Sequence, residues 1–510
     1  MATVVSHIAN DFDTLAANAL RQEPLGDLTE LRLDRIGHPG RDVLRAFFRE
    51  AKKPVIVTCH GKQTGGGFDG SIDEELSLLT DAAEAGARFV DVDWRLSLEL
   101  GEVQAPCHRI VSRHDQAMPE DLDGFAEEVR DVLYEGDVTK VVPTAKSCAE
   151  GLRFLRWLRT TRGLVGFCMG EPGRFTRLLA PIFGSPFTYC APANIPGAGS
   201  GGESEPTAPG QFAVNDFHAI APPGGLNQET AIFAVVGKPI GHSLSPWVHG
   251  MALKGARLDA IYVALEPDAF AEILELCDDE NWRGFSITAP FKEEASRLVG
   301  GGDESVQRTG AVNTLVRERR GWRTANTDVP AIRDTLARGL GIAGRGDGSA
   351  KALADVQALI LGAGGAARAA AWAVRSMGGQ VTVAGRDEGR TGQLAKELDC
   401  AAVRWDERGS VPYDVLVNAT PIGSAAADAD GPDLPIEAEA LREGAVVLDA
   451  VYRPVRTELL AAAHARGCTA VPGGEWFVRQ ASAQFRLFTG AEPDEGLMRA
   501  SFEHALDSAS

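Results

Sequence analysis

The sequence predicts an α/β protein in two parts, an N-terminal (β/α)8 barrel followed by a two-lobed part with a Rossmann-type dinucleotide-binding domain. Three observations predict it. Eight short apolar segments alternate with helical patterns over the first 220 residues, and a Pro/Gly-rich connector, AIAPPGGLNQET, follows at 219–230. Further on, ALILGAGGAARAAAWAVRSMGGQVTVAGRD reads as strand, Gly-rich turn, Ala-rich helix and strand.

Length and composition limit the classes of function. A chain of 510 residues predicts two or three domains, and 44% hydrophobic with 24% charged residues is globular composition. A formal net charge of −20 disfavours nucleic acid and anionic membranes as partners. The eight cysteines form no CxxC pair, and no leader segment or long apolar run is visible, so we expect free thiols and a cytoplasmic location.

The barrel is predicted from its strands. They are expected at 3–9, 28–36, 54–60, 88–94, 108–114, 137–143, 163–169 and 186–191. Helical patterns such as 72–86 and 122–136 lie between them. A doubly wound sheet of similar size is the alternative. The Gly/Ser-rich segment 194–210 precedes the last helical stretch, which favours a lid loop over a domain boundary.

Charged side chains on these strands mark a candidate site. Lys140 stands among the valines of DVTKVVP, where a buried ammonium is costly unless it is paired or gives up its proton. Glu30 and Arg32 share one face of LTELRLDRI, and His114 ends HRIVSRH. The alternatives are a structural ion pair for Glu30 and Arg32, a capping role for His114 and a solvated Lys140. Further polar candidates follow the later strands: Arg177, Thr207 and Gln211.

Residues 1–222 resemble type I 3-dehydroquinate dehydratase. The resemblance rests on ELR, SRHD, DVTKVVP, MGEPGRFTR, FGSPFTYC and TAPGQ. It implies that Lys140 forms a Schiff base with the substrate ketone, and that His114 acts as general base and then as acid. An iminium acidifies the adjacent C–H, and burial favours the neutral amine that must attack. The resemblance also implies a set of substrate-binding residues: Glu30, Arg32, Arg177, Thr207 and Gln211.

The dehydratase half departs from its family in the stretch CHGKQTGGGFDG. His60 and Thr64 stand where family members usually carry an arginine and a glutamate. The departure implies a rearranged grip on the substrate or a weaker activity. Thr207 in place of the usual serine is a milder change.

Residues 231–510 resemble shikimate dehydrogenase. The motifs are GKPIGHSLSP, SITAPFK, GAVNT, ANTD, GAGGAAR, NATPIG, DAVYRP and VRQASAQF. The resemblance implies that Ser243 and Ser245 bind a carboxylate and that Lys292 and Asp328 relay a proton during ketone reduction. A capped turn and a surface ion pair are the alternatives. The residues implied to contact ring hydroxyls are Thr288, Asn313, Tyr452 and Gln480, whereas Ser286, Gly250 and 329–331 depart from the family pattern.

The Gly-rich turn predicts the cofactor site. Gly362, Gly364 and Ala367 occupy the G-x-G-x-x-A positions between a strand and a helix. At the end of the next strand, Arg386 and Arg390 would pair with the 2′-phosphate of NADP, whereas Asp387 would favour NAD unless it caps the following helix. Two guanidinium groups outweigh one carboxylate, so we expect NADP. The remaining predicted cofactor contacts are Gly365, Ala366, Asn418 and Thr420.

Together the halves resemble the fused plant-type bifunctional enzyme of aromatic amino-acid biosynthesis. We expect a dehydratase domain at 1–222, a substrate-binding domain at 230–330 completed by about 455–510, and a Rossmann domain at 331–454. The connector predicts that the two parts are separable. The expected ligands are small molecules (3-dehydroquinate, 3-dehydroshikimate and shikimate) without a metal. Two alternatives stay open: a non-catalytic regulator like the fungal quinate repressors, and a quinate-preferring dehydrogenase.

Overall fold

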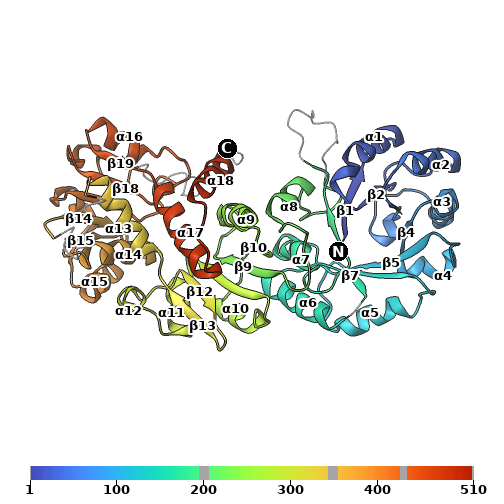
Figure 1. Ribbon diagram of the computed structural model, residues 1–510, viewed down its shortest axis with the longest axis horizontal. Coiled ribbons are helices and arrows are strands. Elements are labelled where there is room, and N and C mark those ends of the chain that lie inside the picture. The colour runs from blue at the N-terminus through green and yellow to red at the C-terminus, as the bar shows by residue number, and fades with distance from the viewer. Residues whose placement is uncertain (1, 162, 194–205, 343–353, 425–433, 508–510) are drawn as a thin grey trace.

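The computed structural model describes residues 2–161, 163–193, 206–342, 354–424 and 434–507. Most of the predicted lid loop at 194–210 lies outside these ranges. The described residues form one eight-stranded sheet, one five-stranded sheet and one six-stranded sheet along the chain. Figure 1 shows the five-stranded sheet between the other two, so the substrate lobe lies between the barrel and the nucleotide lobe.

The first sheet is a nearly closed parallel barrel with the strand order β7-β6-β5-β4-β3-β2-β1-β8. All eight predicted strands are present, so this part of the prediction is confirmed. Consecutive strands from β1 to β7 pair with each other, and β1 also pairs with β8, whereas a doubly wound sheet would reverse its order at a switch point. The strands are β1 (Ala2–Ile8), β2 (Leu28–Arg32), β3 (Val55–Thr58), β4 (Phe89–Asp93), β5 (His108–His114), β6 (Val138–Val142), β7 (Leu164–Gly166) and β8 (Phe187–Cys190).

Helices connect the barrel strands, and the signals that begin them are local. The longest, α3, starts with a capping box in which Ser71 and Glu74 satisfy each other's backbone N–H groups. Its buried face packs against the barrel through Leu78 and Leu79. The helices are α1 (Phe12–Gln22), α2 (Arg41–Glu50), α3 (Ile72–Ala85), α4 (Ser97–Leu100), α5 (Leu122–Arg130), α6 (Cys148–Thr160), α7 (Phe175–Leu179) and α8 (Val214–Ile220).

The second sheet, with the order β10-β9-β11-β12-β13, forms the substrate lobe. Its first three strands are parallel, while β12 and β13 are antiparallel. The strands are β9 (Ala231–Val236), β10 (Ala260–Leu265), β11 (Trp282–Ile287), β12 (Thr314–Arg317) and β13 (Trp322–Ala325). The helices are α9 (Ser245–Gly255), α10 (Phe270–Leu276), α11 (Lys292–Val299) and α12 (Glu304–Thr309).

The third sheet is parallel, with the order β16-β15-β14-β17-β18-β19. The order reverses between β14 and β17, and ligands bind at such a switch point. The strands are β14 (Gln357–Leu361), β15 (Gln380–Ala384), β16 (Ala401–Val403), β17 (Val415–Asn418), β18 (Val446–Asp449) and β19 (Thr469–Val471). The helices are α13 (Asp328–Gly339), α14 (Gly365–Arg375), α15 (Glu388–Glu397) and α16 (Glu458–Ala465).

The end of the chain differs from the expected domain boundary. We expected residues from about 455 onward to complete the substrate lobe, but β19 pairs with β18 as the edge strand of the third sheet. The segment Thr469–Val471 is too short to show a strand periodicity in the sequence, so this edge strand was not predicted. Only α17 (Gly473–Thr489) and α18 (Glu495–Asp507) return to the substrate lobe, where Phe485 and Phe502 pack against β9 and β10.

The barrel and the substrate lobe share one hydrophobic cluster. It runs without a break from barrel residues such as Leu155 and Phe183 to Phe270 and Phe291 of the substrate lobe. Across the same boundary, the guanidinium of Arg159 donates to the Asn281 side chain at 2.7 Å. A Pro/Gly-rich connector therefore does not imply independent parts here, and the structure argues against the expected separability.

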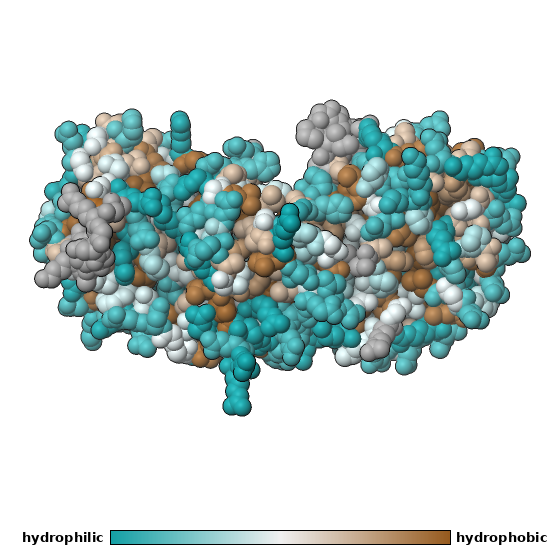
Figure 2. Space-filling view, in the orientation of Figure 1, coloured by the Kyte–Doolittle hydropathy of each residue, from teal (hydrophilic) through white to brown (hydrophobic). Residues whose placement is uncertain are grey.

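The last two observations on the fold concern the hydropathy of the surface and of the helices. Figure 2 shows hydrophilic residues over most of this face of the molecule, with apolar residues scattered between them. Among the described helices, none combines the length and the apolar character needed to cross a membrane.

Candidate active sites

The barrel holds a cavity of about 640 Å³ that is lined by every residue predicted for the first site. Glu30 and Arg32 come from β2, His114 from β5 and Lys140 from β6, so the cavity opens where parallel strands end. The side chains from later segments are Arg177, Thr207 and Gln211.

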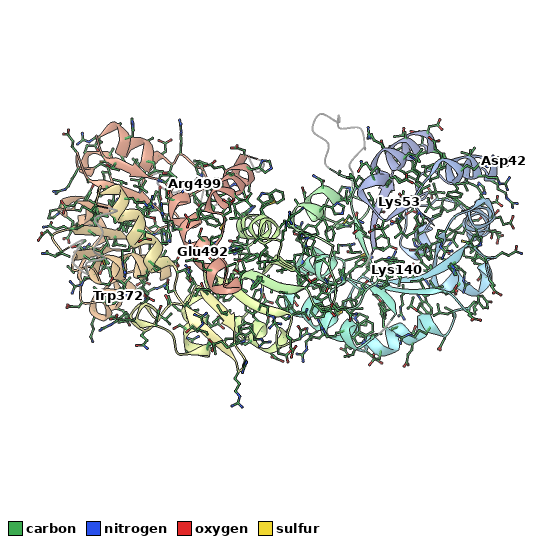
Figure 3. The ribbon with its side chains drawn as sticks, in the orientation of Figure 1. Asp42, Lys53, Lys140, Trp372, Glu492 and Arg499 are labelled. Carbon is green, nitrogen blue, oxygen red and sulfur yellow. The ribbon has the colours of Figure 1, made fainter. Side chains whose placement is uncertain are left out.

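Lys140 is buried and ion-paired. Its Nζ lies 2.7 Å from Oδ2 of Asp91, whose side chain is 0% exposed, and 4.5 Å from the ring centroid of Tyr189. Figure 3 labels Lys140 inside the barrel. Sequence reasoning missed Asp91, although it stands as a charged residue in the apolar strand β4, which is the same signal that marked Lys140. Asp91 thus supplies the counter-charge that a buried ammonium among valines requires.

His114 has the electrostatics of a general base. Burial, followed by the positive charges of Lys140 and His60, holds its pKa well below 6.5. The imidazole is therefore neutral around pH 7 and able to accept a proton. The ring of His60 meets the ring of His114 edge to face, with centroids 5.7 Å apart.

The substrate-binding candidates form a hydrogen-bonded wall. Thr58 Oγ1 donates to Glu30 Oε1 at 2.7 Å, and Ser6 hydrogen-bonds the other oxygen of Glu30. Thr207 Oγ1 donates to Ser6 Oγ at 2.8 Å, and the Thr207 backbone N–H donates to Gln211 Oε1 at 2.9 Å. The wall is thereby fixed before any ligand binds.

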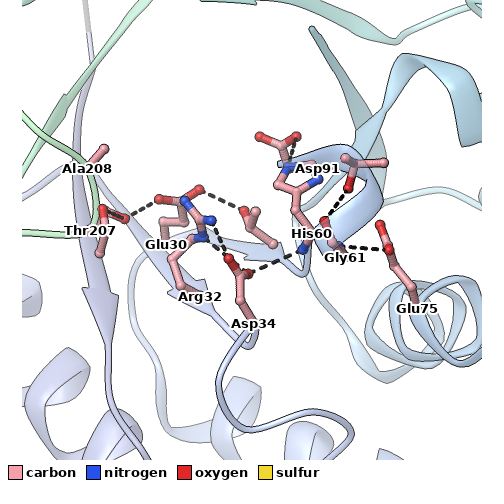
Figure 4. Close-up of polar contacts among 12 residues, drawn as sticks. Glu30, Arg32, Asp34, His60, Gly61, Glu75, Asp91, Thr207 and Ala208 are labelled. Carbon is pink, nitrogen blue, oxygen red and sulfur yellow. Dashed lines mark hydrogen bonds and ion pairs between the residues drawn. The ribbon is translucent and has the colours of Figure 1, made fainter. Parts of the chain in front are cut away.

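Two arginines add positive charge to the same cavity. Arg32 pairs with Asp34, which also accepts a 3.3 Å hydrogen bond from the His60 backbone N–H, as Figure 4 shows. Arg177 is buried against the ring of Phe167, and burial lowers its pKa to about 10, so it stays charged around pH 7.

Several buried polar atoms around this cavity have no hydrogen-bond partner among the described residues. Leaving such an atom unpaired costs about 1–3 kcal/mol, so the cavity suits a polar ligand rather than an apolar one. The atoms include both ring nitrogens of His60, Asp91 Oδ1, Ser112 Oγ, Arg177 Nε and the Tyr189 hydroxyl. The described residues contain no cluster of three His, Cys, Asp or Glu that could hold a metal ion.

A second cavity of about 310 Å³ lies in the dehydrogenase-like part. Its lining includes every residue predicted to bind substrate or transfer a proton there, namely Ser243, Ser245, Thr288, Lys292, Asn313, Asp328, Tyr452 and Gln480. Ala366 of the Gly-rich turn also lines it, so the cavity reaches the predicted cofactor site.

Lys292 and Asp328 form a pair within this cavity. The Nζ of Lys292 donates to Oδ2 of Asp328 at 2.6 Å, and Trp476 Nε1 donates to the other oxygen at 3.2 Å. Lys292 begins α11 and Asp328 begins α13, where a carboxylate is stabilised by the helix dipole. The side chains are largely buried, so this is not a surface ion pair. Trp476 was not predicted from the sequence.

Ser286 takes part in a buried hydrogen-bond chain that sequence reasoning did not foresee. Tyr262 Oη donates to Ser286 Oγ at 2.6 Å, and Ser286 donates to Gln484 Oε1 at 2.8 Å. Gln484 then donates to the backbone carbonyl of Asn313 at 2.9 Å. The serine at this departure from the family pattern is thus held by neighbours on β10 and α17.

The Gly-rich turn fits a dinucleotide. Gly362 has a φ of +117°, and a Cβ there would lie 2.9 Å from the Ala419 carbonyl, so only glycine fits. A Cβ on Gly364 would meet nothing within 4 Å, which leaves room beside the N-terminus of α14 for a phosphate group. Gly365 begins that helix.

The residues after β15 are arranged in a way that favours NADP over NAD. Asp387 is the N-cap of α15 and accepts from the Arg390 backbone N–H at 3.0 Å, so its carboxylate has a structural role. Arg386 is exposed, and Arg390 lies 3.6 Å from Glu293.

The two residues predicted to contact the cofactor after β17, Asn418 and Thr420, are hydrogen-bonded within the protein. The Asn418 amide donates to Asp449, and its oxygen accepts from Thr420. Both residues therefore shape the loop after β17.

Comparison with known proteins agrees with both halves. Residues 4–221 match the family model of type I 3-dehydroquinase, and residues 235–315 match that of the shikimate dehydrogenase substrate binding domain. A chloroplastic bifunctional 3-dehydroquinate dehydratase/shikimate dehydrogenase of Arabidopsis thaliana is 31% identical over 95% of this chain and 81% of its own length. A shikimate dehydrogenase (NADP(+)) of Halobacterium salinarum is 35% identical over 54% of this chain and 99% of its own.

A solved structure is also similar. The shikimate 5-dehydrogenase of Thermus thermophilus, in complex with NADP(H) and shikimate, is 34% identical, covers 54% of this chain and 100% of its own, and has a TM-score of 0.47. The two cavities, the two family models and the bifunctional relative lead to one conclusion. The chain belongs to the family of bifunctional 3-dehydroquinate dehydratase/shikimate dehydrogenases.

Proposed function

We propose that this chain dehydrates 3-dehydroquinate to 3-dehydroshikimate in the barrel and reduces that product to shikimate, with NADPH, in the second part. One observation supports this proposal above the others: each cavity pairs a buried lysine with a carboxylate beside the groups that its reaction needs. A sensor of the same ligands would need the binding walls but neither proton-handling pair.

In the barrel, Lys140 is the nucleophile. The ammonium gives up a proton so that its amine can add to the ketone carbon and form the Nζ–C bond. Two of the three ammonium protons then leave with the carbonyl oxygen as water, and an iminium with one N–H remains. The iminium carries the same charge as the ammonium that it replaces, so Asp91 at 2.7 Å from Nζ stabilises both.

His114 then moves the proton. It removes a proton from the carbon next to the iminium, and the electron pair flows to nitrogen as an enamine. The resulting imidazolium protonates the departing hydroxyl, so water leaves and the imidazole is neutral again. Hydrolysis of the imine returns Lys140 and releases the enone. Arg177, Arg32 and the Glu30 wall hold the substrate during these steps.

In the second cavity, NADPH would be held by the Gly362–Gly364 turn, the N-terminus of α14 and Arg386 with Arg390. The cofactor supplies the hydride for the ketone carbon when it is bound. Lys292 donates a proton to the developing alkoxide, and Asp328 keeps the ammonium in place and helps to return its proton. Ser243 and Ser245 bind the carboxylate of the substrate as hydroxyl donors.

The experiment supplies 3-dehydroquinate to the purified chain and follows the enone absorbance without cofactor, then NADPH oxidation after it is added. Borohydride with 3-dehydroquinate present should inactivate the dehydratase and add the ligand's mass to the peptide with Lys140. A label elsewhere would contradict the assigned nucleophile, and absence of both activities would contradict the function.

The location of the protein is also a proposal. All eight cysteines are free thiols, and six of them are buried, which supports a reducing compartment such as the cytosol.

A further inference from the structure

His60 is the buried group in the dehydratase cavity that the mechanism above does not use. It follows β3, and its almost fully buried side chain lines the cavity beside two groups that act in the reaction. Nε2 lies 3.4 Å from Asp91 Oδ1, and its ring meets that of His114 edge to face with centroids 5.7 Å apart. Figure 4 shows His60 beside Asp91, with its backbone tied to Asp34.

Asp91 is shared between two cations. Oδ2 accepts from Lys140 at 2.7 Å, and Oδ1 has no hydrogen-bond partner among the described residues but faces His60. Because buried polar atoms normally have a partner, His60 is the group placed to hold the second oxygen of this carboxylate.

We propose that His60 is a positioning residue of the dehydratase, which fixes Asp91 against Lys140 on one side and the ring of His114 on the other. This inference rests on the dehydratase function proposed above. It assigns a role to a residue that stands where the family usually has an arginine, and the role differs from a substrate contact because His60 acts through Asp91 and His114.

The charge of His60 gives the role a measurable signature. Burial lowers the pKa of His60, but the adjacent Asp91 carboxylate, 3.4 Å from Nε2, outweighs burial and raises the pKa above 6.5. The His60 charge in turn helps to hold the pKa of His114 below its usual value. The other charged and titratable groups that act on this histidine pair are Arg32, Asp34, Glu75, Asp91 and Lys140.

The test compares His60→Asn and His60→Arg with the wild type. His60→Asn should lower kcat for dehydration about 100-fold with little change in KM, because a misplaced reacting group costs rate rather than binding. It should also raise the pKa of His114, since a neighbouring positive charge is gone. His60→Arg should keep most of the rate and leave that pKa low, because its charge is permanent.

Two readouts follow the His114 titration. One is the acid limb of kcat/KM for dehydration against pH, and the other is the NMR titration of ¹³C-labelled histidine, which needs no turnover. His7→Asn is the matched control, since His7 is equally buried in the same barrel but does not line the cavity. Unchanged reductase activity in all variants shows that they fold.

The outcomes separate the possibilities. A rise in KM alone in His60→Asn would make His60 a substrate contact, and equal losses in His60→Asn and His7→Asn would make its role structural. An unchanged kcat or an unmoved His114 titration would also overturn the inference while the wild-type dehydratase function stands. A wild type without dehydratase activity would overturn both.

Discussion

Replacing Asp91 with asparagine should destabilise the protein in a pH-dependent way. The change leaves Lys140 with a side chain that is 6% exposed and no counter-charge. Breaking one partner out of a buried ion pair costs about 3–5 kcal/mol. An ordinary lysine side chain can instead give up its proton, which costs about 4.6 kcal/mol at pH 7 and so caps the loss.

The free-energy cost of deprotonating a lysine, which limits the loss of stability, falls as the pH rises. In Asp91→Asn the folded state with a neutral lysine binds one proton fewer than the unfolded state, so its stability increases by up to about 1.4 kcal/mol per pH unit. His60 acts in the same direction. Its raised pKa gives the wild type stability that is present below 6.5 and lost as pH rises through the folded value. The deficit should therefore shrink between pH 7 and pH 9.

Urea unfolding of the wild type and the variant at pH 7, 8 and 9 measures this deficit. Asp137→Asn is the matched control, because it strands Arg109, which is 0% exposed and keeps its charge over this range. Its deficit should not change with pH. The double variant Asp91→Asn/Lys140→Met should recover most of the stability. A deficit for Asp91→Asn that is constant from pH 7 to 9, or absent, would refute the reasoning.

Three further predictions concern the second part and the connection. Lys292→Ala and Asp328→Asn should each lower reductase kcat about 100-fold or more and spare dehydration; loss of both activities would instead indicate misfolding. Arg386→Ala should lower kcat/KM for NADP in shikimate oxidation by at least tenfold and leave NAD nearly unchanged, because only NADP carries a 2′-phosphate; equal losses with both cofactors would contradict the assignment. A chain ending at residue 224 should be less soluble and should unfold at lower urea than the full chain, because truncation exposes the shared cluster; equal stability of the shortened barrel would restore the view that the parts are independent.

Much of the fold was predictable because its signals are local. The alternation of apolar segments with helical patterns predicted all eight barrel strands, and the Gly-rich turn predicted the nucleotide-binding sheet. The strand β19 was missed because three residues carry too little periodicity to reveal a pairing with β18. The shared cluster was missed for a related reason: composition describes the connector, whereas packing between α6 and α10 involves residues far apart in the sequence.

In the candidate sites too, residues with a local sequence signal were predicted, whereas roles that depend on distant contacts were not. Charged residues that break an apolar pattern, such as Lys140, could be identified alone, and family motifs supplied their partners. Asp91 gave the same signal but matched no motif used, and Trp476 reads as an ordinary aromatic residue of a helix. That Asp387 caps α15 was foreseen as an alternative, because Asp before a helix is a general signal. Roles that depend on a neighbour across the barrel, such as that of His60, require coordinates.

The hydrophobic cluster that spans the barrel and the substrate lobe ties the lifetimes of the two activities together. If these parts unfold as one cooperative unit, a single damaging event removes the dehydratase and the reductase from the same molecule. During heating or ageing, the total of each activity would then decay with one rate constant while their ratio stays fixed. A cell containing this protein would not accumulate molecules that make 3-dehydroshikimate without being able to reduce it.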